Sequence, residues 1–137
     1  MGNVNKSDTA VNAEANALAV LMNSGKINVY SGPMPGNANT ALSGANNLLA
    51  TLTFSSTAFG TAASGVISAN AITAGTAIAN GTATFARILQ SDGTTVVMDV
   101  TVGVAGSGGI NFSTTTIVVG NAVQLNNWMH TIVETLV

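Results

Sequence analysis

The chain has 137 residues, enough for one domain with a buried core, and it contains no cysteine that could form a disulfide or a thiolate metal site. Only 6% of the residues are charged and the net charge is −2, which excludes the basic surface typical of a nucleic-acid-binding protein. Alanine, glycine, threonine, serine and asparagine take the place of charges. We interpret this composition as a surface that other protein copies cover; a solvated threonine, serine and asparagine face is the alternative.

The N-terminal residues predict neither a signal peptide nor a membrane span. Met1–Lys6 is polar, and the first apolar cluster, Ala17–Met22, is too short for a signal core with its flanks. It is also far shorter than the about 20 apolar residues of a membrane helix. The lack of cysteine is typical of a cytosolic chain or of a particle assembled in the cytosol. We therefore expect a single domain over residues 1–137 and no membrane partner.

A short amphipathic helix is predicted over Asp8–Ser24, after a loose arm at residues 1–6. Ser7 or Asp8 caps its start, because either side chain can accept a hydrogen bond from an N–H of the first turn. Gly25 suits the left-handed position that follows a helix. The helix can cap an open end of the remaining fold or dock on a neighbouring subunit. Its apolar stripe consists of Val11, Ala15, Leu18, Ala19 and Met22.

The rest of the chain has the pattern of β-strands separated by turn residues. Leu48–Ser55 is the clearest case, because apolar and polar residues alternate as in a strand with one face on a core. The predicted fold is mainly β: an antiparallel β-sandwich, jelly-roll-like or Ig-like, preceded by one short N-terminal helix. The expected strands are Lys26–Tyr30, Leu48–Ser55, Val66–Ala71, Ile72–Asn80, Thr82–Gln90, Thr94–Val102, Ile110–Val119 and Ala122–Val137.

Three connections between these strands have a distinct composition. Ser31–Gly36 contains both prolines of the chain and is predicted to be stiff. Asn37–Asn47 is predicted to be a polar loop. Gly103–Gly109 is predicted to be a flexible loop, because four of its seven residues are glycine.

The strongest local signal is a hairpin that turns at Ser91-Asp92-Gly93. Asp-Gly between two alternating runs favours a tight turn, because glycine accepts the positive φ that such turns require. A three-residue loop here pairs Gln90 with Thr94. The hairpin also holds three of the eight charged residues of the chain. Charged residues are therefore more concentrated in this hairpin than elsewhere in the chain.

The hairpin register predicts an ion pair between its two strands. Phe85 is expected opposite Asp99, and Arg87 then lies diagonally from Asp99 on the same face, within reach of its long side chain. If exposed, such a pair contributes only about 0–1 kcal/mol. The Asp92-Gly93 tip and the Arg87/Asp99 face are candidate positions for register-setting contacts, inside the sheet or with a neighbouring protein.

No catalytic, metal-binding or cofactor-binding constellation is predicted. His130 is the only histidine, with Glu134 four residues on, and a surface or interface role is favoured over catalysis. Gly106–Gly109 lacks the lysine and serine or threonine of a phosphate-binding loop. Trp128 beside Met129 is typical of an interface anchor or of a core residue. The candidate interface residues are Arg87, Asp92, Asp99, Trp128, Met129 and His130.

Six runs of the chain carry a family resemblance. They are Asn23–Gly32, Leu48–Phe54, Ala58–Gly60, Ala69–Thr73, Thr82–Arg87 and Ser91–Asp99. Together they resemble a family of small virion-associated structural proteins of tailed bacteriophages and prophages. The likeness covers roughly Leu18 to Val119, and Ser91–Thr95 is its most distinctive piece. The first few residues and the region of Trp128–His130 match less well.

The resemblance implies a structural role on the phage particle, foremost as a head decoration or cement protein on the outside of the major capsid lattice. The implied partners are the major capsid protein and other copies of the chain in a small homo-oligomer. The implied location is the virion, assembled in the bacterial cytoplasm. A neck, collar or tail-tube-like component is the alternative within this role. A carbohydrate- or receptor-binding β-sandwich is the alternative of another class, and we do not expect an enzyme.

Overall fold

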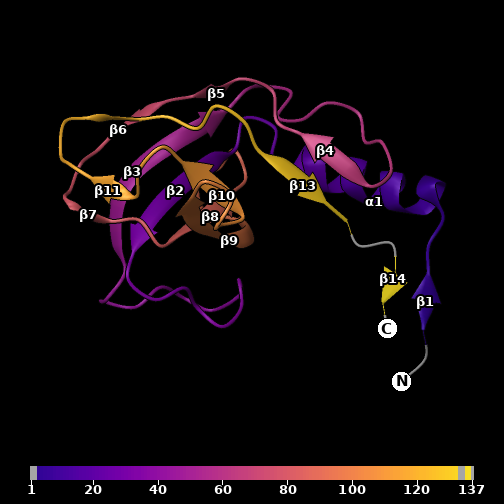
Figure 1. Cartoon of the computed structure of the whole chain (residues 1–137), viewed down its shortest axis with the longest axis horizontal. Helices are drawn as coiled ribbons and strands as arrows, with labels where there is room; N and C mark the ends of the chain where they lie inside the picture. Colours follow the sequence, from indigo (N-terminus) through magenta and orange to yellow (C-terminus); the bar gives the residue numbers. More distant parts are fainter. Residues whose placement is uncertain (1–2, 133–134, 137) are drawn as a thin grey trace.

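The structure is a computed structural model that describes residues 3–132 and 135–136. As predicted, the fold is mainly β with one N-terminal helix (Figure 1). The helix α1 spans Asp8–Leu21. The strands are β1 (Val4–Asn5), β2 (Lys26–Ser31), β3 (Asn47–Phe54), β4 (Val66–Ser68), β5 (Ile72–Thr73), β6 (Gly75–Thr76), β7 (Gly81–Thr82), β8 (Phe85–Leu89), β9 (Val96–Val104), β10 (Ile110–Phe112), β11 (Thr116–Ile117), β12 (Ala122–Val123), β13 (Met129–Thr131) and β14 (Thr135–Leu136).

A curled six-stranded sheet forms the centre of the fold, with the strand order β10-β9-β8-β2-β3-β5 (Figure 1). Neighbouring strands are antiparallel, except that β10 runs parallel to β9. The other described strands form four short ladders of two or three residue pairs: β1/β14, β4/β13, β6/β12 and β7/β11. These ladders, rather than a second extended sheet, accompany the main sheet in the described residues.

Several of the long strands predicted from the sequence are interrupted in the structure. The predicted strand Ile110–Val119 is divided because β10 pairs with β9, whereas β11 pairs with β7. The region 72–82 is divided in the same way among β5, β6 and β7, which pair with three different strands. The last predicted strand, Ala122–Val137, is divided into β12, β13 and β14, and its residues 133, 134 and 137 lie outside the described part. A change of pairing partner therefore ends each piece.

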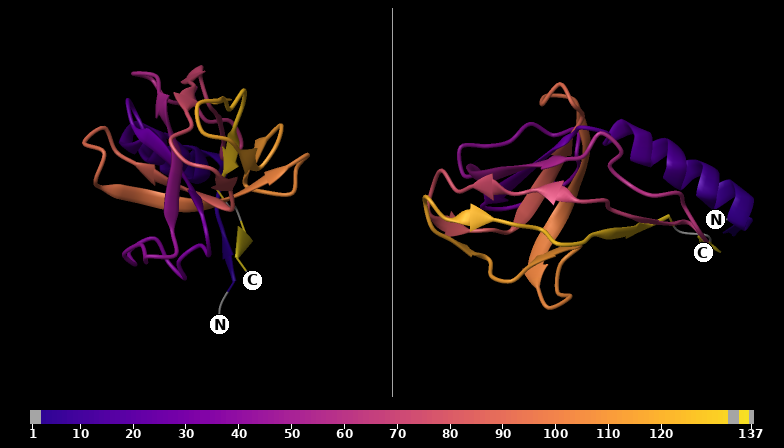
Figure 2. Two further views of the ribbon diagram at one scale, coloured as in Figure 1. Left: turned by 90° about the vertical axis from the view of Figure 1, so that its left-hand side faces the viewer. Right: turned by 90° about the horizontal axis from the view of Figure 1, so that it is seen from above.

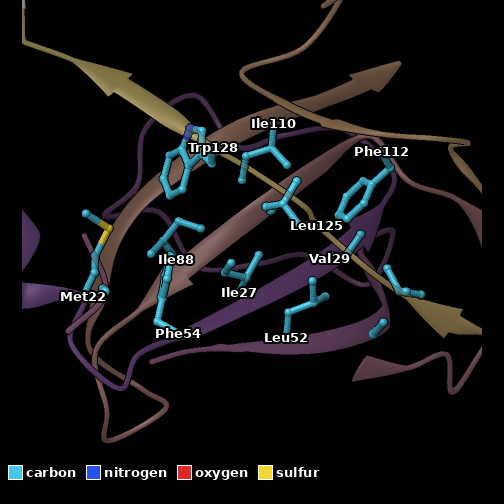
Figure 3. Close-up of a cluster of buried hydrophobic side chains, with 14 of the residues drawn as sticks. Met22, Ile27, Val29, Leu52, Phe54, Ile88, Ile110, Phe112, Leu125 and Trp128 are labelled. Atoms are coloured by element: carbon cyan, nitrogen blue, oxygen red, sulfur yellow. The ribbon is translucent and has the colours of Figure 1, made fainter. Parts of the chain in front are cut away.

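One hydrophobic cluster fills the inner side of the sheet (Figure 3). Ile27, Leu52 and Ile88 come from three adjacent strands and are fully buried, and Leu125 and Trp128 come from the C-terminal segment. Burial of a large apolar side chain contributes about 1.5–3 kcal/mol. The C-terminal segment is therefore an integral part of the core.

Strand β3 departs at one point from its predicted alternation. The pairing of β2 with β3 shifts between Val29 and Tyr30, so that Leu49 is an extra residue in β3. As a result Leu49 is fully buried, and Leu48, which was expected on the apolar face, is partly exposed. Leu52 and Phe54 keep the predicted inward orientation.

The helix begins as predicted and ends earlier. The Oγ of Ser7 accepts a hydrogen bond from the N–H of Ala10 at 3.2 Å, so Ser7 is the N-cap. The helix ends at Leu21 rather than Ser24. The left-handed position expected for Gly25 is occupied by Ser24, with φ 55°, so that assignment was wrong. Glycine is needed at 25 for another reason, because a Cβ there would collide with the carbonyl oxygen of Leu89.

Three asparagines, which we call the asparagine clamp, fasten α1 to the segment 58–65 of its own chain. In each case the side-chain oxygen accepts a hydrogen bond from a backbone N–H. The helix also buries one apolar side, so it caps one end of its own fold (Figure 2). The clamp bonds are Asn12 to Gly65 at 2.8 Å, Asn16 to Ala62 at 2.9 Å and Asn23 to Ala58 at 2.9 Å.

Candidate functional site

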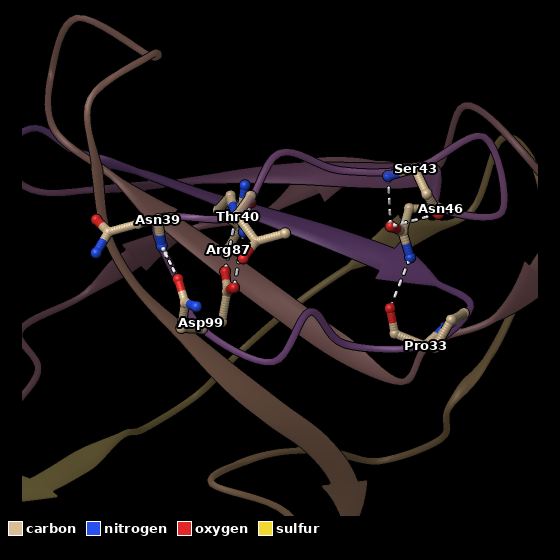
Figure 4. Close-up of polar contacts among 8 residues, drawn as sticks. Pro33, Asn39, Thr40, Ser43, Asn46, Arg87 and Asp99 are labelled. Atoms are coloured by element: carbon tan, nitrogen blue, oxygen red, sulfur yellow. Dashed lines mark hydrogen bonds and ion pairs between the residues drawn. The ribbon is translucent and has the colours of Figure 1, made fainter.

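The predicted ion pair between β8 and β9 is present and is buried. Arg87 Nε lies 2.7 Å from Asp99 Oδ1, and a second guanidinium nitrogen lies 2.8 Å from Oδ2 (Figure 4). Their side chains are only 7% and 5% exposed. The hydrogen bonds that Arg87 donates to the Asp99 carboxylate raise the pKa of Arg87 above its ordinary value. The pair is therefore a structural element of the sheet, and the low contribution expected for an exposed pair does not apply.

The register of this hairpin differs from the prediction. Arg87 lies directly opposite Asp99, and Phe85 lies opposite Thr101. The pairing shifts between Ile88 and Leu89, where Val97 is an extra residue in β9. The loop closes at Thr95 instead of Thr94, which shifts the pairing by one residue, and the bulge shifts it by a second residue. Together the two shifts make the contact between Arg87 and Asp99 direct rather than diagonal.

A cover loop, residues 32–46, lies over the ion pair. Arg87 donates a third hydrogen bond, of 2.9 Å, to the carbonyl oxygen of Thr40 (Figure 4). Asn46 closes the loop by donating to the carbonyl oxygen of Pro33 at 2.8 Å and accepting from the N–H of Ser43 at 3.0 Å. The ion pair thus holds the loop on the sheet, and the loop shields the ion pair from water.

The tip of the hairpin is organised by Asp92. Its carboxylate accepts hydrogen bonds from the N–H groups of Thr94 and Thr95, both at 2.9 Å, and from the Thr95 hydroxyl. These bonds lower the pKa of Asp92 to about 2. Gly93 has the expected positive φ, 74°. The backbone bond that closes the turn joins the N–H of Gln90 to the carbonyl of Thr95, not to Thr94 as predicted.

The three C-terminal candidate residues lie in different environments. Trp128 is a core residue, 3% exposed, and packs against Phe54 and Phe59. His130 packs edge-on against Trp128, and burial lowers the pKa of this histidine. Met129 points outward and is 62% exposed. Glu134, considered as a partner of His130, lies outside the described residues.

One side of β9 is open. Strand β10 pairs only with Val102–Val104, and along Val96–Thr101 no described strand pairs with the side of β9 that faces away from β8. A cavity of about 540 Å³ lies here. We call it the edge groove; its floor is Met98–Thr101, and its walls include Met34 of the cover loop and Met129 with His130 of β13.

A second exposed surface lies at the end of the β6/β12 and β7/β11 ladders. Ile78, Val118 and Val119 are 64%, 47% and 53% exposed, and we call these three residues the apolar tip. Asn80 fixes their position by accepting a hydrogen bond from the N–H of Val119 at 2.8 Å. A neighbouring backbone bond of 2.8 Å joins Gly120 to Ala77. The apolar tip is thus a set of exposed side chains on a hydrogen-bonded frame.

A polar cavity of about 440 Å³ lies beside the C-terminal segment. Its lining includes the amide side chains of Gln124, Asn126 and Asn127, which are exposed. Asn111 also lines it, but its amide is engaged with Gly106 and Gly108 and holds together the loop that was predicted to be flexible. The cavity offers neutral hydrogen-bonding groups.

Sequence reasoning missed the asparagine clamp, the apolar tip and the edge groove, because each joins residues that are distant in the chain. The regular spacing of Asn12 and Asn16 beside the apolar stripe was the one available signal for the clamp. Among the described residues, no three histidine, aspartate or glutamate side chains gather as metal ligands do, and no helix is long and apolar enough to cross a membrane. No protein-family model, curated protein or solved structure matches the chain.

Proposed function

We propose that the chain is a structural protein of a tailed-phage virion, and specifically a decoration or cement protein on the outside of the capsid lattice. The observation that carries the proposal is the apolar tip. Three large apolar side chains are exposed together on a hydrogen-bonded frame, in a chain that carries few charges. Exposed apolar groups of this kind mark protein contacts. The resemblance of the hairpin and strand motifs to virion-associated proteins supplies the identity of the partner.

The physical requirements of a cement protein agree with these features. Cementing needs no chemistry, only many copies that bind at symmetry-related places. Each copy can bury a standard interface of about 1,600 Å², and attachment at several points multiplies modest affinities. Contacts that do not rely on charge also form over a wide range of salt concentrations.

The proposal includes a two-layered architecture. We infer that the short ladders β6/β12 and β7/β11 act as the second layer of a β-sandwich, opposite the main sheet. Ile117 and Val123 from these ladders belong to the same buried cluster as the inner face of the sheet, which supports this view.

The copy number in purified virions tests the role. A decoration protein is present in numbers comparable to the major capsid protein, whereas a neck, collar or tail component is limited to a few rings. Quantitative gel densitometry against the major capsid protein measures the ratio. A copy number that corresponds to only one or a few rings per virion would contradict the proposal and favour the neck or tail alternative.

The contribution of the apolar tip is tested with matched variants. Ile78→Glu places a charge in the apolar tip, and Val20→Glu places one on α1 at an equally exposed apolar position, 65% against 64%. We expect Ile78→Glu to weaken binding to capsids that lack the protein by at least tenfold. Val20→Glu should bind as the unchanged chain does. Equal binding of both variants would contradict a docking role of the apolar tip.

The polar cavity favours one second candidate, a carbohydrate-binding role. Gln124, Asn126 and Asn127 present neutral donors and acceptors that suit sugar hydroxyls. Binding of the isolated protein on a glycan array, lost in the Gln124→Ala and Asn127→Ala variants, would support this candidate. No binding on the array would remove it.

A further inference from the structure

We propose that the open edge of β9 is a self-association surface, at which two copies pair their β9 strands antiparallel around Asp99. This joins the two six-stranded sheets into one continuous sheet across a two-fold axis. The inference is independent of the virion role, because it concerns the isolated protein.

The hydrogen-bonding pattern of β9 supports this pairing. The N–H of Val102 donates to the carbonyl of Thr84, on the β8 side. Because successive residues of a strand direct their N–H and C=O groups to opposite sides, Asp99 directs both of its groups away from β8 and into the edge groove. Thr101 faces the same side but lies beside Gly109, whose N–H donates to the Thr101 hydroxyl at 3.0 Å. Strand edges with unsatisfied backbone groups are templates for pairing with another strand.

The edge lacks most of the devices that prevent pairing. Monomeric proteins protect an open edge with lysine, proline or an inward-pointing charge. Val96–Thr101 has no lysine or proline, and its single charge, Asp99, is engaged by Arg87. The bulge at Val97 lies at one end and Gly109 lies against Thr101 at the other, so the open regular part of the edge is Met98–Val100. The Asp99 carboxylate is neutralised by Arg87, so two copies can approach without repulsion.

The walls of the edge groove favour a second copy as the occupant. Met34 and Met129 both line the groove and are 42% and 62% exposed. Methionine side chains adapt to irregular apolar contacts, and in a two-fold pair each wall can cover its counterpart. A two-fold pair of identical antiparallel strands is self-complementary, because residue i contacts j and j contacts i. The groove offers no unpaired charge that would select a charged foreign peptide.

The pairing around Asp99 makes a specific geometric prediction. Met98 of one copy lies opposite Val100 of the other, as a non-hydrogen-bonded pair with a Cα separation of about 4.5 Å. This separation allows a disulfide, which needs about 4.4–6.8 Å. Two Met98 residues, or two Val100 residues, lie diagonally at about 7–8 Å and are too far apart.

Cysteine cross-linking tests this geometry, and the chain has no native cysteine to interfere. Met98→Cys and Val100→Cys are prepared separately, checked for folding by circular dichroism, and oxidised alone and as an equimolar mixture. We expect disulfide-linked dimers in the mixture only. Dimers from either variant alone, or none in the mixture, would overturn the pairing around Asp99.

Sedimentation equilibrium of the cysteine-free chain gives an independent measurement. Met129→Glu places a charge in the wall of the edge groove, and Ile78→Glu places one in the apolar tip. We expect the unchanged chain to dimerise and Met129→Glu to weaken the dimer at least tenfold, with no effect of Ile78→Glu. A monomer at all concentrations, or a dimer that Met129→Glu leaves unchanged, would refute the proposal.

Discussion

At the scale of single residues, the buried ion pair is the most sensitive feature of the sheet. Removing two charges from water is costly, and the bidentate contact between Arg87 and Asp99, with the third bond to Thr40, offsets that cost. The loss of one partner leaves the other charge buried alone. Replacing one partner is therefore expected to lower the free energy of unfolding more than replacing both.

Arg87→Met should lower the free energy of unfolding by about 3–5 kcal/mol, because it leaves the Asp99 carboxylate buried without a partner. Arg87→Met/Asp99→Leu should recover most of this loss, because apolar side chains of similar volume carry no desolvation cost. Urea denaturation of both variants measures the difference. A loss below about 1 kcal/mol in the single variant would show that the pair is more hydrated than its burial indicates.

Asp92 should make stability depend on acid pH. Its pKa is lowered from 3.8 to about 2 in the folded chain, so the unfolded chain binds the proton more readily. The stabilisation is therefore present above about pH 4 and is lost as the pH falls through about 2. Asp92→Asn lacks this titration, and its deficit in unfolding free energy relative to the unchanged chain should shrink between about pH 5 and pH 2. A deficit that stays constant would contradict the role of the carboxylate.

At the scale of elements, side chains and close backbone contacts join α1 and the short strands to the main sheet. The sequence predicted the hairpin well, because the alternation and Asp92-Gly93 are local signals. It missed the register, because the loop closes at Thr95 instead of Thr94 and a bulge at Val97 adds a second shift. A bulge depends on both strands of a pair, so the residues of one strand do not predict it. It identified the start of α1 from Ser7 but placed its end too late, since Ser24 rather than Gly25 takes the left-handed conformation. The sequence pattern did not predict which strands pair when they are distant in the chain.

The asparagine clamp should contribute measurably to stability. Asn16→Ala removes the acceptor for the partly buried N–H of Ala62, and we expect a loss of about 1–2 kcal/mol in the free energy of unfolding. Alanine is the best helix former, so the substitution also stabilises the helix itself. The measured loss is therefore a lower bound on the contribution of the hydrogen bond. Asn16→Asp keeps an acceptor oxygen and should retain more of the stability. If the two variants unfolded alike, the hydrogen bond would not be the cause.

Gly75 should tolerate no side chain. A Cβ at this position would collide with the backbone carbonyl of Thr51, where β6 passes close to β3. Gly75→Ala should therefore cost about 1–3 kcal/mol, measured by thermal unfolding. Gly36→Ala is the matched control, because nothing lies within 4 Å of a Cβ there, and it should change stability by at most about 0.5 kcal/mol. If Gly75→Ala left the thermal stability unchanged, the two strands would be able to move apart at little cost in free energy.

At the scale of the whole molecule, the helix end, the curled sheet and the C-terminal segment share one core. Deletion of residues 1–24 should abolish cooperative unfolding, because Val11, Ala15 and Met22 are fully buried against the rest of the chain. Deletion of residues 1–5, which leaves the Ser7 N-cap, should preserve it. A folded domain after the longer deletion would restore the alternative of a helix that docks on a neighbouring subunit.

We propose separate roles for the two exposed surfaces: docking on the capsid for the apolar tip, and association of two copies for the edge groove. The most direct test of the central claim is a reconstruction of virions that contain the chain. We predict density for the curled sheet on the outside of the capsid lattice, at symmetry-related positions, with Ile78 and Val119 facing the major capsid protein. Density only in the neck or tail, or no copies on the particle, would contradict the account.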